Sequence, residues 1–217
     1  MLDLTCGGAK IDSALFLGAH SDDIEIGCGG TIQRLVAARP NARIYWVTLS
    51  SEGVRAEETR NAAAKLTSGA KITDVRTESF AESFFPYRGA DIKAYFERLK
   101  REMNPDVVFT HYRNDLHQDH RVVNELTWNT FRNHLVLEYE IPKFDGDLGV
   151  PNAFSPLTKA QIDRKIDVLL ECFSSQRTKS WFTRDTFQGL ARLRGIECNA
   201  PEGFAEAFYA RKMSLSF

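Results

Sequence analysis

The sequence has few cysteines, almost no net charge and no long apolar run, and these features argue against several classes of protein. Its 217 residues include only four cysteines and no C-x-x-C pair, so neither a disulfide framework nor a Cys₄ zinc site is indicated. The net charge of −1 provides no basic surface for nucleic acid or an anionic membrane. No apolar run is long enough to span a bilayer, and no basic-then-apolar signal peptide is present. We therefore expect a cytoplasmic protein without a membrane span or a nucleic-acid partner.

Short apolar runs alternate with amphipathic stretches over the first two-thirds of the chain. The apolar runs predict strands, and they cover residues 14–19, 43–49, 71–79, 106–111 and 135–141. The amphipathic stretches predict helices, and they cover residues 29–39, 56–67, 91–103 and 121–131. Strands that alternate with helices are typical of a mostly parallel sheet covered on both faces. The prediction is a Rossmann-like α/β sandwich of three layers.

The last third of the chain has a different pattern. Residues 142–156 begin and end at proline and contain Gly146, Gly149 and Pro151, which together predict a loop. Two amphipathic helices are predicted after it, over residues 158–173 and 184–194, the second ending at Gly195. We interpret this region as a C-terminal cap of helices and loops on the same domain, so that residues 1–217 form a single domain.

Two polar clusters follow predicted strands. His20, Asp22 and Asp23 come directly after the first strand, and the run from His117 to His120 follows the strand that ends at residue 111. Because carboxyl ends of parallel strands share one edge of a sheet, the two clusters can meet there. They offer two nitrogens and one oxygen to a metal, with carboxylates left for proton transfer, as in a catalytic zinc site with an open position.

Each cluster alone has a simpler interpretation. Aspartates in a turn from strand to helix serve as N-caps, and a single histidine is more often packed or exposed than bound to metal. However, four of the five histidines fall in or beside the two clusters: His20, His111, His117 and His120. The coincidence favours a metal site.

The glycines from Gly27 to Gly30 offer an alternative, a dinucleotide-binding loop. The full G-x-G-x-x-G spacing is absent, because Ile32 stands where the third glycine would be. We expect these glycines, and Cys28 between them, to allow close packing of the helix on the strand.

The sequence resembles the LmbE-like or PIG-L family of metal-dependent N-acetylglucosaminyl deacetylases. The family's A-H-P-D-D motif, continued as I-E-x-G-C-G-G-T, matches residues 19–31 with Ser21 in place of proline. Its H-x-D-H element matches residues 117–120. Residues 55–66, the pair Ser175-Gln176 and residues 205–208 are also similar to its pattern. The substitution at Ser21 is expected to reduce the rigidity of the turn rather than change its chemistry.

The resemblance implies a zinc-dependent deacetylase that releases acetate and a free amine from an N-acetylglucosamine-type sugar conjugate. Its implied metal ligands are His20, Asp23 and His120. Asp22 would act as general base and then general acid, because an amine leaves poorly unless it is protonated. His117, oriented by Asp119, would stabilise the oxyanion. Arg55 would contact a substrate hydroxyl or an anionic group, unless it is only a solvated helix end.

Several alternatives stay open at this point. Two imidazoles and a carboxylate suit zinc, but also Fe²⁺, Co²⁺ or Ni²⁺. The chain could instead be a non-catalytic Rossmann-like module that binds a nucleotide or sugar. It could also be a metal-dependent hydrolase of an ester or a non-sugar amide. The sequence does not determine the sugar's partner group, and a homo-oligomer is compatible with it.

Overall fold

The computed structural model describes residues 11–213 and contains a seven-stranded sheet. The strands are β1 (Ser13–His20), β2 (Arg43–Ser50), β3 (Ile72–Thr77), β4 (Val107–His111), β5 (Leu135–Tyr139), β6 (Ala153–Leu157) and β7 (Phe204–Ala210). Their order across the sheet is β3-β2-β1-β4-β5-β7-β6. The first five strands are parallel to one another, whereas β7 is antiparallel to both β5 and β6. The predicted α/β sandwich with a mostly parallel sheet is confirmed.

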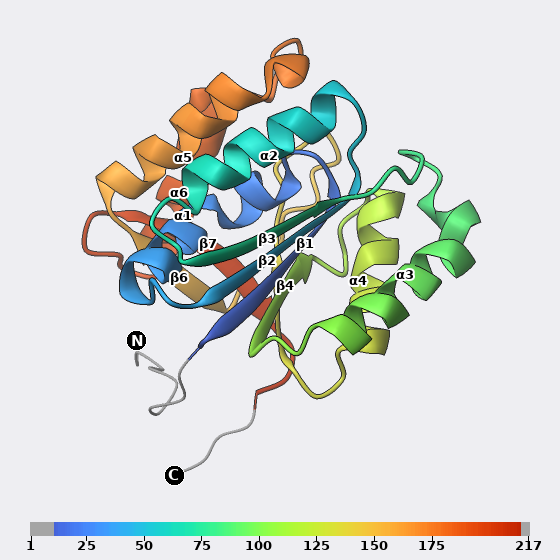
Figure 1. Ribbon diagram of the computed structural model, residues 1–217. Coiled ribbons are helices and arrows are strands. Elements are labelled where there is room, and N and C mark those ends of the chain that lie inside the picture. The colour runs from blue at the N-terminus through green and yellow to red at the C-terminus, as the bar shows by residue number, and fades with distance from the viewer. Residues whose placement is uncertain (1–10, 214–217) are drawn as a thin grey trace.

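Helices cover both faces of this sheet (Figure 1). One layer contains α1 (Asp23–Ala38), α2 (Val54–Leu66), α5 (Lys159–Cys172) and α6 (Arg184–Glu197). The other contains α3 (Gly89–Glu102) and α4 (Gln118–Thr130). Two short 3₁₀ helices, η1 (Phe85–Arg88) and η2 (Ser174–Gln176), join these elements. Within residues 11–213, no helix is both long and apolar enough to cross a membrane.

Strand β1 lies at the centre and explains why its sequence is an unbroken apolar run. Successive side chains of a strand point to opposite faces, so Phe16 enters the core below α1 and α5, while Leu15 and Leu17 enter the core below α3 and α4. Phe16 also stacks on Phe109 of β4, with ring centroids 4.6 Å apart. The pairing fixes β1 beside β4 and aligns their carboxyl ends.

The C-terminal region does more than cap the sheet. Residues 153–157, predicted as loop, form the edge strand β6, and residues 204–210 form β7, for which no strand was predicted. Pro156 is compatible with β6 because an edge strand has backbone groups that need no partner. Helix α6 also continues past Gly195, which was predicted to end it. A methyl group at that position would lie 2.2 Å from the Gly203 carbonyl oxygen, so this glycine permits close packing.

Strand β7 supplies a side chain to the backbone of α1. The Glu206 carboxylate accepts hydrogen bonds from the amides of Gly30 (2.8 Å) and Thr31 (2.7 Å) in the middle of that helix. Lys165 of α5 donates to the Ile26 carbonyl (2.5 Å), one helical turn before Gly30, and pairs with Glu206 at 2.7 Å. The buried ion pair between Glu206 and Lys165 thus stabilises the glycine-containing half of α1 by hydrogen bonds to the backbone of that helix.

The strand order reverses at β1. The chain passes from β1 to β2 and β3 on one side and then returns to β4 on the other. In open α/β sheets, ligands bind at the carboxyl ends of the strands beside such a reversal. His20 ends β1 and His111 ends β4, so both histidines lie at this position.

Candidate metal centre

The first polar cluster lies where β1 passes into α1. His20 is the last residue of the strand, and the helix begins at Asp23, six residues before the predicted start. Asp22 connects them with φ of 99°, a left-handed conformation that is strained for any residue except glycine. The Asp23 carboxylate accepts a hydrogen bond from the His20 backbone amide at 2.7 Å. This tight turn directs both side chains to the edge of the sheet.

The second cluster begins α4. His117 is the N-cap, where its Nδ1 accepts a hydrogen bond from the Asp119 amide at 3.2 Å. Helix α4 therefore begins at Gln118, three residues before the predicted start, and His120 lies in its first turn. The N-cap interpretation and the site interpretation are compatible here, since His117 caps the helix that presents His120.

The three predicted ligands converge. His120 Nε2 lies 3.2 Å from His20 Nδ1 and 3.5 Å from Asp23 Oδ1, and His20 Nδ1 lies 3.6 Å from Asp23 Oδ2. A tetrahedral zinc ion with bonds of about 2.0–2.1 Å requires ligand atoms about 3.3 Å apart. All three residues are buried. The donor types fit a divalent metal such as zinc, although the two spacings to Asp23 involve different carboxylate oxygens. Single donor atoms converge in two overlapping groups, one formed by His20, His117 and His120 and the other by Asp23, His111 and His120.

A carboxylate holds the other nitrogen of each histidine ring. His20 Nε2 is 2.9 Å from Asp119 Oδ2, and His120 Nδ1 is 2.9 Å from Asp115 Oδ2. Such contacts fix the orientation and tautomer of a ligand histidine. The prediction that Asp119 orients His117 is wrong in this respect. The Asp119 carboxylate is turned toward His20 and also accepts the amide hydrogen of Ser83 at 2.6 Å.

Burial and charge adjust the protonation of these groups. Burial, assisted by the charge of nearby His111, lowers the pKa of His120 to about 3 and leaves its ring neutral. For His20, burial acts in the same direction, but the hydrogen bond to Asp119 and the charges of Asp23, Glu82 and Asp119 together outweigh it, and the pKa is raised. Burial would raise the pKa of Asp23, but its interactions with the surrounding imidazoles, including a hydrogen bond with His111, hold it well below its usual range. The result is an ionised carboxylate beside two imidazoles.

Asp22 stands apart from the three converging residues. Burial and the neighbouring charge of Asp23 raise its pKa to about 7. Arg55 of α2 approaches Asp22 with 3.6 Å between Nη2 and Oδ1, and it also donates to the Ser21 carbonyl. The Ser21 hydroxyl donates to Ser51 Oγ at 2.7 Å. The site thus has an acid whose pKa lies near neutrality and a cation beside it, both predicted as site residues.

His117 lies next to the converging residues and is partly exposed. Its ring centroid is 4.8 Å from that of His20 and 4.6 Å from that of His120. Burial and the charge of His20 lower the pKa of its ring, although the charge of Asp119 acts in the opposite direction. Because Nδ1 accepts a hydrogen bond from the backbone, the neutral ring carries its proton on Nε2. His117 is therefore a hydrogen-bond donor without being charged.

Three further residues were not among the predicted site residues. Asp115 contacts His120. Lys143 lies in a segment predicted as a loop, but its side chain is only 8% exposed and packs against Asp115, with 3.0 Å between Nζ and Oδ2. His111 is fully buried and stacks on His120 at 3.8 Å between ring centroids, with Nε2 3.2 Å from Asp23 Oδ2. Asp115 could have been found from the sequence, because it is a carboxylate only five residues before the proposed ligand His120. No sequence signal connected Lys143 to the site.

The profile of the PIG-L family, described as GlcNAc-PI de-N-acetylase, matches residues 15–131 of this chain. That range contains both polar clusters. The chain is also 30% identical, over 147 residues, to the uncharacterized deacetylase YaiS of Escherichia coli K12, a match that covers 61% of this chain and 76% of YaiS.

Solved structures share the fold at lower sequence identity. The N,N'-diacetylchitobiose deacetylase of Pyrococcus horikoshii is 16% identical with a TM-score of 0.66, covering 91% of this chain and 82% of that one. The 4-carboxy-2-hydroxymuconate hydratase GalB of Pseudomonas putida is 18% identical with a TM-score of 0.70, covering 95% and 98%. A deacetylase and a hydratase thus share this fold, so the reaction must be argued from the residues of the site.

Proposed function

Because the chain belongs to the PIG-L family, a group of hydrolases that act on N-acetyl groups, we propose that it is a zinc-dependent deacetylase of an N-acetylglucosamine-type sugar conjugate. The products are acetate and a free amino sugar. The observation that carries this proposal is the convergence of His20, Asp23 and His120, with an unligated carboxylate, Asp22, beside them. A module that only binds nucleotides or sugars would not need this arrangement.

In the proposed site, His20, Asp23 and His120 hold the metal. When bound, the metal polarises the amide carbonyl and makes water a better nucleophile at neutral pH. The chain's contribution is orientation, because Asp119 and Asp115 fix the two imidazole rings.

Asp22 moves the proton. It accepts a proton from the attacking water and then delivers that proton to the nitrogen of the breaking amide bond, so that the amine leaves in neutral form. Its raised pKa, to about 7, suits both directions of transfer. The left-handed turn at Asp22 supports this assignment, because strained backbone commonly occurs at functional residues.

His117 stabilises the negative charge that develops on the carbonyl oxygen by donating from Nε2. The backbone contact at Nδ1 maintains the required tautomer in the neutral ring. Arg55 is proposed to bind a substrate hydroxyl or anionic group, while it also limits the movement of Asp22.

A panel of N-acetylglucosamine conjugates tests the proposal, with acetate release as the readout. The panel includes nucleotide-linked, thiol-precursor, antibiotic and inositol-linked forms, together with a simple ester and a non-sugar acetamide. We expect acetate from at least one sugar conjugate and none from Asp22→Asn with its metal bound. Acetate release only from the ester or the non-sugar amide would reject the sugar substrate and retain the hydrolase. No hydrolysis in any arm by the zinc-loaded protein would reject the proposed reaction.

A further inference from the structure

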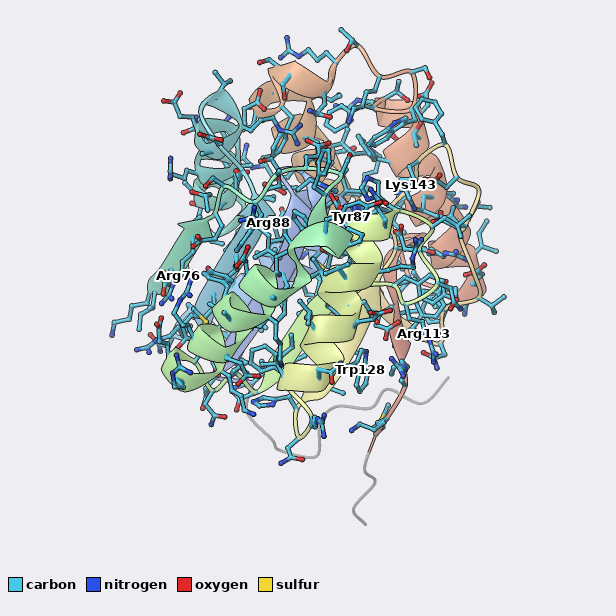
Figure 2. All side chains as sticks on the ribbon, turned by 90° about the vertical axis from the view of Figure 1, so that its right-hand side faces the viewer. Arg76, Tyr87, Arg88, Arg113, Trp128 and Lys143 are labelled. Carbon is cyan, nitrogen blue, oxygen red and sulfur yellow. The ribbon has the colours of Figure 1, made fainter. Side chains whose placement is uncertain are left out.

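A buried lysine connects a distant segment to the metal centre. Lys143 lies after β5, in the region predicted as a loop. Its Nζ is 3.0 Å from Asp115 Oδ2 and 2.5 Å from Asp147 Oδ2. The three side chains are only 8%, 2% and 5% exposed. Figure 2 shows Lys143 toward the end of the molecule where α4 begins, with Trp128 toward the opposite end.

Asp115 uses both carboxylate oxygens within the metal-binding loop. Oδ1 accepts a hydrogen bond from the His117 amide at 2.8 Å, and Oδ2 is 2.9 Å from His120 Nδ1. Lys143 approaches the same Oδ2 atom. The ammonium therefore contacts the oxygen that sets the orientation of the His120 ring.

Asp147 completes the connection from the other side. Its Oδ2 accepts a hydrogen bond from the Leu116 amide at 2.7 Å, in addition to the contact with Lys143. The segment from Lys143 to Asp147 thus contacts the loop before α4 at two consecutive residues, through an ion pair with Asp115 and a hydrogen bond from the Leu116 amide. Both attachments lie immediately before the helix that carries His120.

The charges explain what the ammonium does there. The buried carboxylates of Asp115 and Asp147 both contact the Lys143 ammonium, which lies between them. Without it, Asp115 would lose its charged partner and could either turn away from His120 or draw the ring proton more strongly. Either change alters how His120 presents Nε2 to His20 and Asp23.

We propose that Lys143 is a positioning residue that maintains the metal-binding geometry of His120 through Asp115. This proposal rests on the proposed metal site and is independent of which substrate the enzyme uses. The alternative is that Lys143 contributes only to stability, because removing one partner of a buried ion pair destabilises the folded state.

Lys165 provides a matched control for that alternative. It is the other lysine of the described residues placed in a buried pair, with Glu206 at 2.7 Å, and it contacts none of the proposed ligands' side chains. Lys165→Met and Lys143→Met each remove one buried ammonium; the first leaves one acid without its partner, Glu206, and the second leaves two, Asp115 and Asp147. A purely structural role predicts similar losses of thermal stability and no difference in zinc affinity.

The test measures zinc dissociation constants by competition with a chromophoric chelator, and thermal unfolding of the metal-free proteins. We expect Lys143→Met to weaken zinc binding by about 10–100-fold, the usual effect of losing a group that supports a ligand. Lys165→Met, which acts on α1 and not on a ligand's side chain, should weaken zinc binding much less than Lys143→Met does, and Lys143→Arg should recover most of the affinity.

Native zinc affinity in Lys143→Met would overturn the proposal, and so would an equal loss in Lys165→Met. If Lys143→Met does not fold, Lys143→Gln replaces it, because glutamine keeps a hydrogen-bond donor without the charge. Lys143→Gln should bind zinc more weakly than the native protein, and an unchanged zinc affinity would overturn the proposed positioning role. Failure of the native protein to bind zinc would refute the proposed metal site itself. Turnover is not needed for any of these measurements, so an error in the proposed substrate leaves the result intact.

Discussion

Gly27 tests whether the packing of α1 determines the geometry of the metal centre. It lies one helical turn after Asp23, against the ring of Tyr139. A methyl group at Gly27 would lie 2.3 Å from Tyr139 Cδ2 and 2.6 Å from Cγ, well inside contact distance. The ring cannot easily retreat, because it is fully buried and its hydroxyl donates to the Leu17 carbonyl at 2.6 Å.

The magnitude follows from two opposing effects of Gly27→Ala. Alanine favours the helix by up to about 1 kcal/mol relative to glycine. Overpacking of a rigid core typically costs about 1–3 kcal/mol, and contacts this short belong at the upper end. The net loss is about 2 kcal/mol in the free energy of unfolding, which lowers Tm by about 4–8 °C for a chain of this size.

Gly189 in α6 is the control for helix propensity. A methyl group there meets no atom within 4 Å, so Gly189→Ala should gain about 0.5–1 kcal/mol and raise Tm by about 1–4 °C. Thermal unfolding of the two metal-free variants makes the comparison. Gly27→Ala should also bind zinc more weakly, because a shift of α1 moves Asp23.

A second variant identifies the cause. Tyr139→Leu removes the ring that the new methyl group would meet, so the double variant should be less destabilised than the sum of the two single changes. A Gly27→Ala protein as stable as Gly189→Ala would refute the reasoning, and strictly additive effects with Tyr139→Leu would refute the proposed contact.

Three further predictions concern the site residues. Asp23→Asn should lose zinc, whereas Asp22→Asn should retain zinc and lose at least about 10²-fold in kcat; near-normal turnover by the latter would assign the base elsewhere. His117→Ala should keep its zinc and lose about 10²–10³-fold in kcat, and full activity would leave it only as the N-cap of α4. His120 should lower the stability of the metal-free protein as pH falls from 6.5 toward 3, because unfolded His120 binds a proton that the buried ring, with a pKa of about 3, excludes. Asp22, with its pKa raised to about 7, acts in the opposite direction, so the contribution of His120 is measured as a difference between variants. Denaturant midpoints should fall less toward low pH in His120→Asn than in the native protein, and an identical dependence would contradict this linkage.

The sequence was sufficient to predict the five parallel strands and the approach of the two clusters, but not the strands β6 and β7. Alternating strands and helices place His20 and His120 after adjacent parallel strands, which requires no knowledge of side-chain packing. The start of α1 was harder to predict because its glycines disfavour a helix in isolation. Tertiary contacts override this preference, including the Tyr139 ring and the hydrogen bonds from Glu206.

The supporting residues could not be predicted because they depend on distant segments. Asp119 has two histidines within reach along the sequence, and only the folded turn directs its carboxylate to His20 rather than His117. Lys143 lies in a glycine-containing region whose sequence has no periodic pattern. Its role becomes visible only when β5 aligns beside β4 and brings residues 143–147 against Asp115.

The contact between Glu206 and α1 has a consequence for protein synthesis. At about 5–20 residues per second, a ribosome needs roughly ten to thirty seconds to proceed from the end of α1 to Glu206. By about the middle of that interval the nascent chain contains His20, Asp23 and His120, but the helix beneath them still lacks the partner for its central amides. A polypeptide interrupted before Glu206 therefore carries every proposed ligand on an incomplete scaffold. We expect such fragments to be recognised by proteases rather than to accumulate as active enzyme.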